Sequence, residues 1–355
     1  MKKLSERLFF YLNALFAFLM LLSVLAMYIK PDFWIIPSFL ALTFPFLLFI
    51  NLVFLVIYIY YRKKYFFLSL SALILAYPAL TNTFSFNLPI KSADDEFRLM
   101  SYNVRLFNLY DWIEDIHAAD EILAVIKREN PDVLCMQEFY SNSAERNLID
   151  EIMETGDFLQ YYCPGYENGK SFGSIIFSRF PIVNYGSFQA DGSDNTFVFA
   201  DIETGDRTLR FYSLHLASLY LSNSDYDFID NIADNNRSET VESLSGILSK
   251  MSFAYKKRLS EISAITRHSN ETELPVILCG DFNDVPVSYA YRHFRSDYKD
   301  AFKTAGFGTG NTYMRRLVRF RIDYVFYNEP LKAVDFSVIR KKYSDHYPVV
   351  VDFGF

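Results

Sequence analysis

Polar side chains stand at the ends of four segments whose apolar residues are typical of buried strands. These positions are Ser-Tyr-Asn103, Cys-Met-Gln-Glu138, Gly-Asp281-Phe-Asn283 and, just ahead of the last segment, Ser-Asp345-His346. A single Asn or Asp at a strand end usually makes only a local turn. Four such ends in one chain indicate more, because side chains at one edge of a pair of sheets converge on one cleft. Carboxylates, amides and histidines gathered there suit a hard divalent cation and a phosphate ester.

The segments that carry these residues alternate with helical patterns. Residues 97–103 alternate as a strand does, 113–129 repeat apolar residues at helical spacing, and 133–137 form a buried strand. Further strands are expected at 174–178, 196–202, 208–216, 275–279, 322–327, 333–339 and 347–353, with a long amphipathic helix at 237–267 and a polar surface excursion at 222–236. Strands outnumber the interspersed helices, which predicts two packed sheets flanked by helices.

The first 90 residues differ in composition from the rest of the chain. All 355 residues together are 51% hydrophobic with a formal charge of −7, but residues 1–90 hold only nine charged side chains and a net charge of +5. The remainder holds 68 charged side chains and a net charge of −12, as expected of a soluble globular domain. This acidic balance disfavours tight, sequence-independent binding of nucleic acid, which depends on Lys and Arg.

The first part is predicted to be a membrane anchor. Residues 8–29 and 33–61 contain long apolar stretches that suffice to cross a bilayer, and 65–84 is expected as a third, shorter span. A cleaved signal peptide is the alternative for the first stretch, but no convincing cleavage site follows it. A short polar linker at 91–96 then leads into a domain at 97–355.

The cations that flank the spans predict their orientation. Three cations precede residue 8, and Arg62–Lys64 separates the second span from the third. The positive-inside rule places both groups in the cytoplasm and the C-terminal domain on the outer face of a cytoplasmic membrane, which in a bacterium is the periplasmic face. If the third span does not cross, the domain is cytoplasmic.

Six short motifs follow one another along the domain. They are M-S-Y-N-V at 100–104, P-D-V-L-C-M-Q-E at 131–138, Y-S-L-H-L at 212–216, G-D-F-N at 280–283, R-I-D-Y-V at 321–325 and S-D-H-Y-P at 344–348. In kind, order and spacing the set resembles the endonuclease/exonuclease/phosphatase superfamily across essentially all of 97–355. The resemblance implies a deoxyribonuclease I-like, four-layer α/β/β/α sandwich that follows the α-helical membrane region.

The resemblance also implies a metal site and a phosphate-binding site. Glu138 would bind Mg²⁺ or Mn²⁺, with Asn103 and Asp345 as further oxygen ligands or as positioning groups. Asn283 would donate a hydrogen bond to the phosphoryl oxygens. Hydrolysis of a phosphate ester needs such charge neutralisation around the equatorial oxygens.

Four further roles concern protons and developing charge. Asp281 would orient or deprotonate the attacking water, and His346, held by Asp323, would stabilise the developing negative charge. His215 would bind phosphate or protonate the leaving group. The alternative for His215 is a satisfied core histidine in an alternating strand.

One departure from the family pattern involves arginine. Family nucleases often carry an acid or amide two positions after the first Asn, where this chain has Arg105, so one auxiliary metal contact is in doubt. Arg105 and Arg321 are candidates for binding a substrate phosphate. Arg321 belongs to a basic run that could guide a phosphorylated substrate or meet anionic lipid headgroups; a solvated arginine is the alternative for Arg105, and solvent-facing charges on edge strands for the run.

The sequence predicts a membrane-anchored, divalent-metal-dependent phosphoesterase that hydrolyses a phosphate mono- or diester. Tethering at a bilayer favours a phospholipid, a lipid-linked phosphate or a sugar phosphate as substrate. A nuclease acting on DNA or RNA is the first alternative. The second is a catalytically inactive, membrane-bound binding module, which would be expected to lack one of the site residues, and none is missing.

Overall fold

The computed structural model describes residues 2–88, 97–110, 117–142, 146–155, 159–166, 172–222, 224–225, 228, 237–315 and 318–355. The chain divides into two compact units, Met1–Phe84 with Asp284–His293, and Ser85–Asn283 with Phe294–Phe355. The predicted linker at 91–96, the start of the helix predicted at 113 and most of the polar excursion at 222–236 lie outside the described residues.

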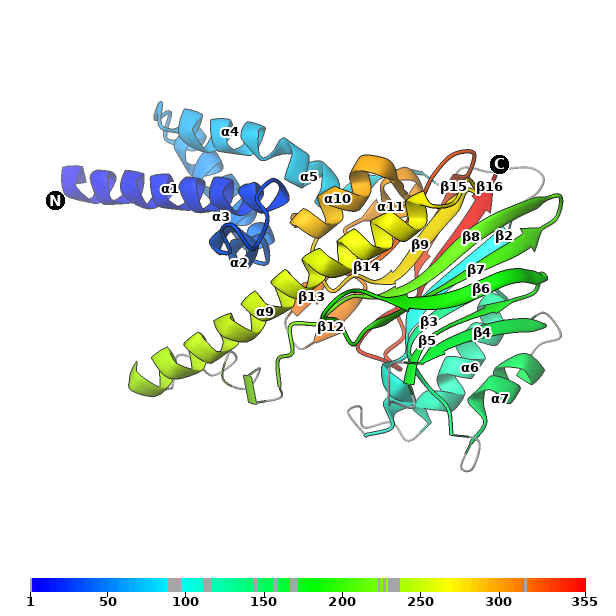
Figure 1. Cartoon of the computed structure of the whole chain (residues 1–355). Helices are drawn as coiled ribbons and strands as arrows, with labels where there is room; N and C mark the ends of the chain where they lie inside the picture. The colour runs from blue at the N-terminus through cyan, green and yellow to red at the C-terminus, as the bar shows by residue number, and fades with distance from the viewer. Residues whose placement is uncertain are drawn as a thin grey trace. The chain divides into compact units, whose positions relative to one another are not determined.

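The larger unit contains two six-stranded sheets (Figure 1). One sheet has the strand order β15 (Lys332–Val338), β16 (Val349–Gly354), β2 (Phe97–Asn103), β3 (Val133–Tyr140), β5 (Phe172–Ser178) and β4 (Tyr161–Tyr166). The other has the order β10 (Lys299–Asp300), β14 (Asp323–Tyr327), β9 (Val276–Asp281), β8 (Arg207–His215), β7 (Thr196–Thr204) and β6 (Ile182–Gln189). Two short pairs join β1 (Ser85–Phe86) to β11 (Phe307–Gly308) and β12 (Tyr313–Arg315) to β13 (Val318–Phe320).

The two sheets pack face to face and helices cover their outer faces. Leu99 and Ile176 of the first sheet meet Phe211 and Ile277 of the second in one buried cluster. On the far side of the first sheet, Ile122 belongs to a second cluster that unites the sheet with α6 (Ala118–Glu129) and α7 (Leu148–Thr155). The predicted four-layer α/β/β/α sandwich is confirmed.

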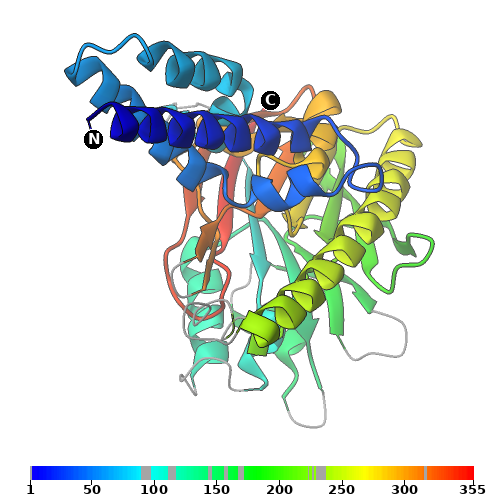
Figure 2. The same cartoon turned by 90° about the vertical axis from the view of Figure 1, so that its left-hand side faces the viewer.

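Helix α9 (Arg237–Asn270) covers the outer face of the second sheet (Figure 2). Near the end of the helix, the His268 ring stacks on Phe188 at 4.3 Å between centroids, and its Nδ1 forms a 2.8 Å hydrogen bond with the Tyr212 hydroxyl. The predicted amphipathic helix is therefore present and three residues longer than expected. Further helices that the structure describes after residue 97 are η2 (Arg105–Asn108), α10 (Tyr289–Asp297) and α11 (Ala301–Ala305).

The smaller unit is helical. Its elements are α1 (Lys2–Val24), η1 (Leu25–Met27), α2 (Ile36–Ala41), α3 (Phe44–Tyr60), α4 (Phe66–Leu75) and α5 (Tyr77–Thr83). Among the described residues, one helical stretch, Glu6–Met27, is by itself long and apolar enough to cross a membrane; α4 and α5 qualify only as a pair bent by 61°. Three spans were predicted, whereas the described residues contain one helix that could cross a membrane by length and composition, or two if the bent pair forms a single span.

Prolines explain this difference. Pro37, Pro45 and Pro78 each lie in the first turn of α2, α3 and α5, where their missing N–H is tolerated, but none can sit in the interior of a continuous helix without breaking it. The apolar stretch at 33–61 is therefore divided into a six-residue and a seventeen-residue helix.

Several polar side chains are buried and several large apolar side chains are exposed in this helical unit. Asn13, Asn51 and Ser69 are fully buried, while Phe18 and Phe46 are 61% and 70% exposed. The Ser69 hydroxyl donates to Asn13 Oδ1 at 2.8 Å, and Asn51 Nδ2 donates to the Leu47 carbonyl at 2.8 Å. Exposed apolar side chains of this size are typical of surfaces that contact lipid or another protein.

Candidate active site

Strand register brings three of the predicted site residues into one row. Strands β8 and β9 are parallel with His215 opposite Asp281, and β14 is antiparallel to β9 with Asp323 opposite Asp281. The row therefore crosses the three neighbouring strands β14, β9 and β8 at the end of the second sheet where β8 and β9 terminate. Strand ends that are far apart in the sequence thus supply two carboxylates and an imidazole to one place.

Gly280 is required for this approach of β8 to β9. Its φ is +136°, and a Cβ at this position would lie 2.0 Å from the Leu214 carbonyl oxygen. Only glycine fits, because that contact is with backbone and cannot be relieved by a side-chain movement. The glycine that precedes Asp281 is therefore part of the machinery that positions its carboxylate.

The first sheet contributes Asn103 and Glu138 to the same edge. Strands β2 and β3 are parallel, Asn103 pairs with Gln137, and the register of β3 shifts between Met136 and Phe139. Glu138 lies in this irregularity with φ at +49°, a backbone conformation uncommon for a residue with a side chain. The irregular backbone leaves the Glu138 side chain 27% exposed, whereas Asn103 is fully buried.

The two sheets meet at the side chain of Asn103. Its Nδ2 donates to Glu138 Oε1 and to Asp281 Oδ2, each at 3.1 Å, and its Oδ1 accepts the Arg105 backbone N–H at 3.0 Å. In this arrangement Asn103 holds the two carboxylates at a fixed separation. Its two N–H donors are both used on these carboxylates, which fits the positioning role, and the second lone pair of its Oδ1 stays available to a cation.

Asp281 is the centre of the cluster. Its Oδ1 accepts the Asn283 backbone N–H at 2.8 Å, and its Oδ2 lies 3.2 Å from Asn283 Nδ2 and 3.6 Å from His346 Nε2. Burial raises the pKa of Asp281 to about 6, because water no longer stabilises the charged form. A carboxylate with a pKa near neutrality is suited to accept a proton at physiological pH.

His346 is held between two acids. Its Nδ1 lies 2.9 Å from Asp323 Oδ2, and its Nε2 faces Asp281. Burial alone would lower the pKa of His346, but the neighbouring carboxylates of Asp323 and Asp281 outweigh burial and hold the pKa well above its ordinary value. The predicted His346–Asp323 pairing is thus present, and the ring is disposed to carry positive charge.

His215 completes the cluster from the opposite side. Its Nε2 lies 3.5 Å from Glu138 Oε1 and 3.8 Å from Asp281 Oδ2, and among the described residues this buried atom has no hydrogen-bond partner. A satisfied core histidine would have such a partner. The open Nε2 therefore points to a group that comes from outside the chain.

Arg105 and Asp345 form an ion pair. The Arg105 Nη1 lies 3.1 Å from Asp345 Oδ2, with the two side chains only 18% and 16% exposed. Arg105 begins a run of four residues with positive φ, Arg105–Asn108, separated from the end of β2 by one residue. The Asp345 carboxylate predicted as a metal ligand is thus partly neutralised by the cation that departs from the family pattern.

The structure corrects the expectation for Arg321. This side chain is 2% exposed, and its Nη1 lies 2.8 Å from the equally buried Asp300 carboxylate. Its guanidinium also lies 4.4 Å from the centre of the Phe302 ring. Arg321 therefore cannot meet a substrate phosphate in this fold; the exposed members of the predicted basic run that the structure describes are Arg319, Arg340, Lys341 and Lys342.

Two buried charges of α9, missed in the sequence, fix the backbone beside His215. Glu261 Oε2 accepts the Ala217 N–H at 2.8 Å, and Arg258 Nε donates to the Ala217 carbonyl at 2.7 Å. The intervening Leu216 carbonyl accepts Asn283 Nδ2 at 2.9 Å. Both charged residues lie on the buried face of an amphipathic helix. Charged residues at these otherwise apolar helix positions were the sequence feature that could have revealed them.

The donors present fit a divalent cation. Asp281, Asp323 and His346 form one group among the described residues whose ligand atoms all lie within 4.8 Å of one another. Asp323 and His346 already form a hydrogen bond with each other. The more exposed Glu138 carboxylate and the His215 Nε2, which has no hydrogen-bond partner among the described residues, are therefore more accessible to an added ion or phosphate. Oxygen donors at this density are what hard cations such as Mg²⁺ prefer.

Comparison with known proteins agrees with this architecture. Residues 100–346 match the "Endonuclease/Exonuclease/phosphatase family", and residues 6–83 match a "Domain of unknown function (DUF8431)". No match was found among curated proteins. The chain belongs to the endonuclease/exonuclease/phosphatase family, as the motifs predicted, and the hydrolysis of phosphoric ester bonds is the chemistry of that family.

Several solved structures share the fold. A family member from Bacteroides vulgatus is 17% identical and covers 74% of this chain and 100% of its own, with a TM-score of 0.53. The mannosyl-6-phosphatase Bt3783 of Bacteroides thetaiotaomicron is 18% identical over 73% of this chain and 100% of its own, with a TM-score of 0.52. Truncated TDP2 of Caenorhabditis elegans is 16% identical over 73% and 98%, with a TM-score of 0.51. At these identities the likeness concerns the fold alone.

Proposed function

We propose that the chain is a membrane-anchored phosphoesterase that uses a divalent cation, Mg²⁺ or Mn²⁺, to hydrolyse a phosphate mono- or diester with water. The observation that carries the proposal is the convergence of Glu138, His215, Asp281 and the His346–Asp323 pair on one edge of the two sheets. A structural role does not require two imidazoles and three carboxylates in one cluster, because burying charged groups is costly even when they are paired.

Each residue has a distinct part in the proposed reaction. Glu138 would hold the cation, which when bound supplies charge neutralisation to the phosphoryl oxygens. Asp281 accepts a proton from the attacking water, as its pKa of about 6 allows. Asn103 keeps the Glu138 and Asp281 carboxylates apart and aligned.

The remaining groups act on the phosphate and the leaving oxygen. His346, kept cationic by Asp323, donates a hydrogen bond to the negative charge that grows on the phosphoryl group. Asn283 would donate from Nδ2 to a phosphoryl oxygen in place of its 3.2 Å hydrogen bond to Asp281, while its other N–H stays on the Leu216 carbonyl. His215, with its Nε2 open toward Glu138 and Asp281, binds the phosphate or protonates the leaving alcohol.

We propose a sugar phosphate or a lipid-linked phosphate as the substrate. The mannosyl-6-phosphatase with the same fold supports a sugar phosphate, and the apolar exterior of the helical unit supports a substrate found at a membrane. The net charge of −12 on residues 91–355 weighs against nucleic acid.

The full chain, purified in detergent, tests this function. With Mg²⁺ or Mn²⁺ it should hydrolyse bis-(p-nitrophenyl) phosphate and at least one of a hexose phosphate or a phospholipid, and EDTA should lower the rate about 100-fold or more. Plasmid DNA should be a poorer substrate. Turnover that is unaffected by EDTA would refute the metal-dependent mechanism, and DNA as the preferred substrate would establish the nuclease alternative.

We also propose that the helical unit is embedded in the cytoplasmic membrane. Its buried asparagines and exposed phenylalanines support a lipid environment. Lys63 Nζ lies 3.2 Å from Glu6 Oε1, so the start of α1 and the turn between α3 and α4 lie on the same side. This side holds most cations of the unit and is therefore assigned to the cytoplasm. If the bent pair α4 and α5 crosses, the larger unit, which we call the catalytic unit because it carries the proposed active site, lies outside.

Reporter fusions test the sidedness. Alkaline phosphatase fused after residue 90 should be active, and the same reporter fused after Tyr61 should be inactive, because that enzyme folds only outside the cytoplasm. A fluorescent protein that folds in the cytoplasm, fused at both points, provides the matched control and should give the reverse pattern. Activity after Tyr61 alone would invert the orientation, and inactivity at both points would place the catalytic unit in the cytoplasm.

A further inference from the structure

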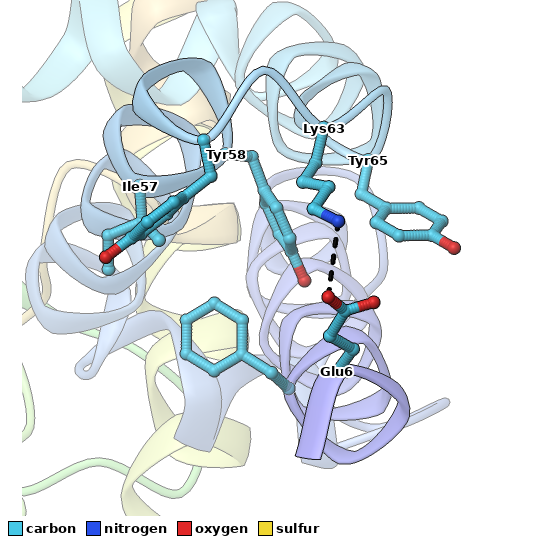
Figure 3. A pocket seen from close by; sticks show the side chains of 7 residues that line it. Glu6, Ile57, Tyr58, Lys63 and Tyr65 are labelled. Atoms are coloured by element: carbon cyan, nitrogen blue, oxygen red, sulfur yellow. Dashed lines mark hydrogen bonds and ion pairs between the residues drawn. The ribbon is translucent and has the colours of Figure 1, made fainter. Parts of the chain in front are cut away.

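The helical unit contains a cavity of about 350 Å³ at the end where α1 begins and α3 ends. Its lining is mostly aromatic with one acid and one base: Glu6, Phe9, Ile57, Tyr58, Tyr61, Lys63 and Tyr65. Figure 3 shows Glu6 and Lys63 facing each other at this cavity, with the rings of Tyr58 and Tyr65 to either side. A space of this size accommodates a small polar group and the first part of an attached chain.

The charged pair at the cavity is accessible. The Lys63 and Glu6 side chains are 44% and 57% exposed while 3.2 Å apart. An ion pair this exposed contributes little to the free energy of unfolding. Glu6 and Lys63 can therefore separate and bind a ligand with little loss of stability. Together they offer one negative and one positive contact to a group that carries both charges.

A buried hydroxyl lines the same cavity beside a buried amide. Tyr58 is 5% exposed, Asn13 of the adjacent α1 is fully buried, and the Asn13 side chain contacts the Tyr58 hydroxyl. Because Asn13 Oδ1 already accepts the Ser69 hydroxyl, Asn13 offers its Nδ2 to the Tyr58 oxygen. The O–H proton of Tyr58 has no acceptor among the described residues and is available to an acceptor in the cavity.

Aromatic rings surround the charged pair. The Tyr58 ring lies edge-on to Phe9 at 5.6 Å and to Tyr65 at 5.7 Å between centroids. Faces of Phe and Tyr attract an ammonium group, most strongly where water is excluded. An aromatic enclosure beside a carboxylate is therefore suited to an alkylammonium group.

We propose that this cavity binds the headgroup of a zwitterionic phospholipid. The ammonium group contacts Glu6 and the aromatic rings, and the phosphate accepts hydrogen bonds from Lys63 and the Tyr58 hydroxyl. The assignment rests on the proposed membrane location of this unit. The surrounding surface supports a lipid over a soluble headgroup, since Leu8, Ile59 and Tyr60 are 61%, 55% and 75% exposed and provide an apolar path for acyl chains.

Native mass spectrometry of the full chain tests this site. The protein is reconstituted in nanodiscs with equal amounts of phosphatidylethanolamine and phosphatidylglycerol, and the lipid that stays bound is identified. Wild type should retain phosphatidylethanolamine selectively, and Glu6→Gln or Lys63→Gln should lower its retention about tenfold, because each removes one charged contact. Tyr58→Phe should lower retention by a smaller factor without loss of charge.

Lys64→Gln is the matched control, because it removes the same charge from a neighbouring residue that does not line the cavity. It should leave the selectivity unchanged. Equal retention of both lipids by wild type, or equal effects of Lys63→Gln and Lys64→Gln, would contradict the proposed site. Displacement of the lipid by millimolar glycerophosphoethanolamine would identify a soluble ligand instead. Phosphoesterase activity measured in the same samples separates these outcomes from failure of the proposed reaction.

Discussion

Asp281→Asn should lower the rate of phosphate-ester hydrolysis about 1,000-fold while leaving the protein folded. The amide keeps the size of the carboxylate but cannot accept a proton from water, and general base catalysis contributes factors of this order. Because the Asp281 carboxylate is 1% exposed and its pKa is raised by burial, loss of its charge relieves a desolvation cost. This gain opposes the loss of the hydrogen bonds that one carboxylate oxygen accepts, because the amide nitrogen cannot accept them. We therefore expect a thermal midpoint close to that of wild type. The measurement is kcat at saturating Mg²⁺ together with the thermal midpoint.

Asp335→Asn is the control for this substitution. Asp335 is a partly exposed aspartate of β15, in the other sheet and outside the cluster around Asp281. It undergoes the same chemical change, and its kcat should stay within about twofold of wild type. If Asp281→Asn keeps more than about a tenth of the wild-type kcat, another group accepts the proton and the role proposed for Asp281 is wrong.

The residues of the site were predictable because strand ends carry their chemistry in the sequence. Asn103, Glu138, Asp281 and His346 each follow or precede an apolar run, and parallel pairing of β2 with β3 and of β8 with β9 places such ends on one edge. The family motifs added the order of these strands. Local pattern and topology agreed at these positions, which is why the fold class and the composition of the cluster could be predicted from the sequence alone.

Side-chain partners were less predictable, because they depend on residues distant in the chain. Arg105 lies 240 positions before its partner Asp345, so the sequence does not reveal that this arginine neutralises an acid of the site. The irregular backbone at Glu138 is equally hidden, since its φ of +49° is imposed by the register shift of β3. Strand β6 escaped notice for a different reason: it is an edge strand with exposed Val183 and Tyr185 and shows little apolar alternation.

The length of an apolar stretch was a misleading guide to the helices. Residues 33–61 are long enough to span a bilayer when counted, but Pro37 and Pro45 interrupt the count. Pro78 has the same effect at the bend between α4 and α5. The signal was present in the sequence, since a proline ends an i to i−4 hydrogen-bond ladder whatever the hydropathy of its neighbours.

Arg321→Met should destabilise the catalytic unit by about 3–5 kcal/mol, because it leaves the Asp300 carboxylate buried without its partner. Both side chains are about 1% exposed and 2.8 Å apart. At roughly 2–4 °C per kcal/mol, the thermal midpoint of the full chain should fall by about 10 °C. Lys299→Met is the control, since the ion pair of Lys299 with Glu329 is exposed and its loss should shift the midpoint by no more than about 2 °C.

A second substitution separates the lost pair from lost packing. Asp300 Oδ1 also accepts the Phe302 N–H at the start of α11, so Asp300→Asn retains an oxygen for this contact while removing the charge. The double variant with Arg321→Met should regain at least half of the decrease in thermal midpoint seen for Arg321→Met alone, because no unpaired charge remains buried. The KM of Arg321→Met, measured below its unfolding transition, should match wild type. A tenfold higher KM with an unchanged midpoint would contradict this structural role and would support contact between Arg321 and the substrate phosphate. The structural role requires that the Arg321–Asp300 pair stabilises the fold, so its loss must lower the midpoint.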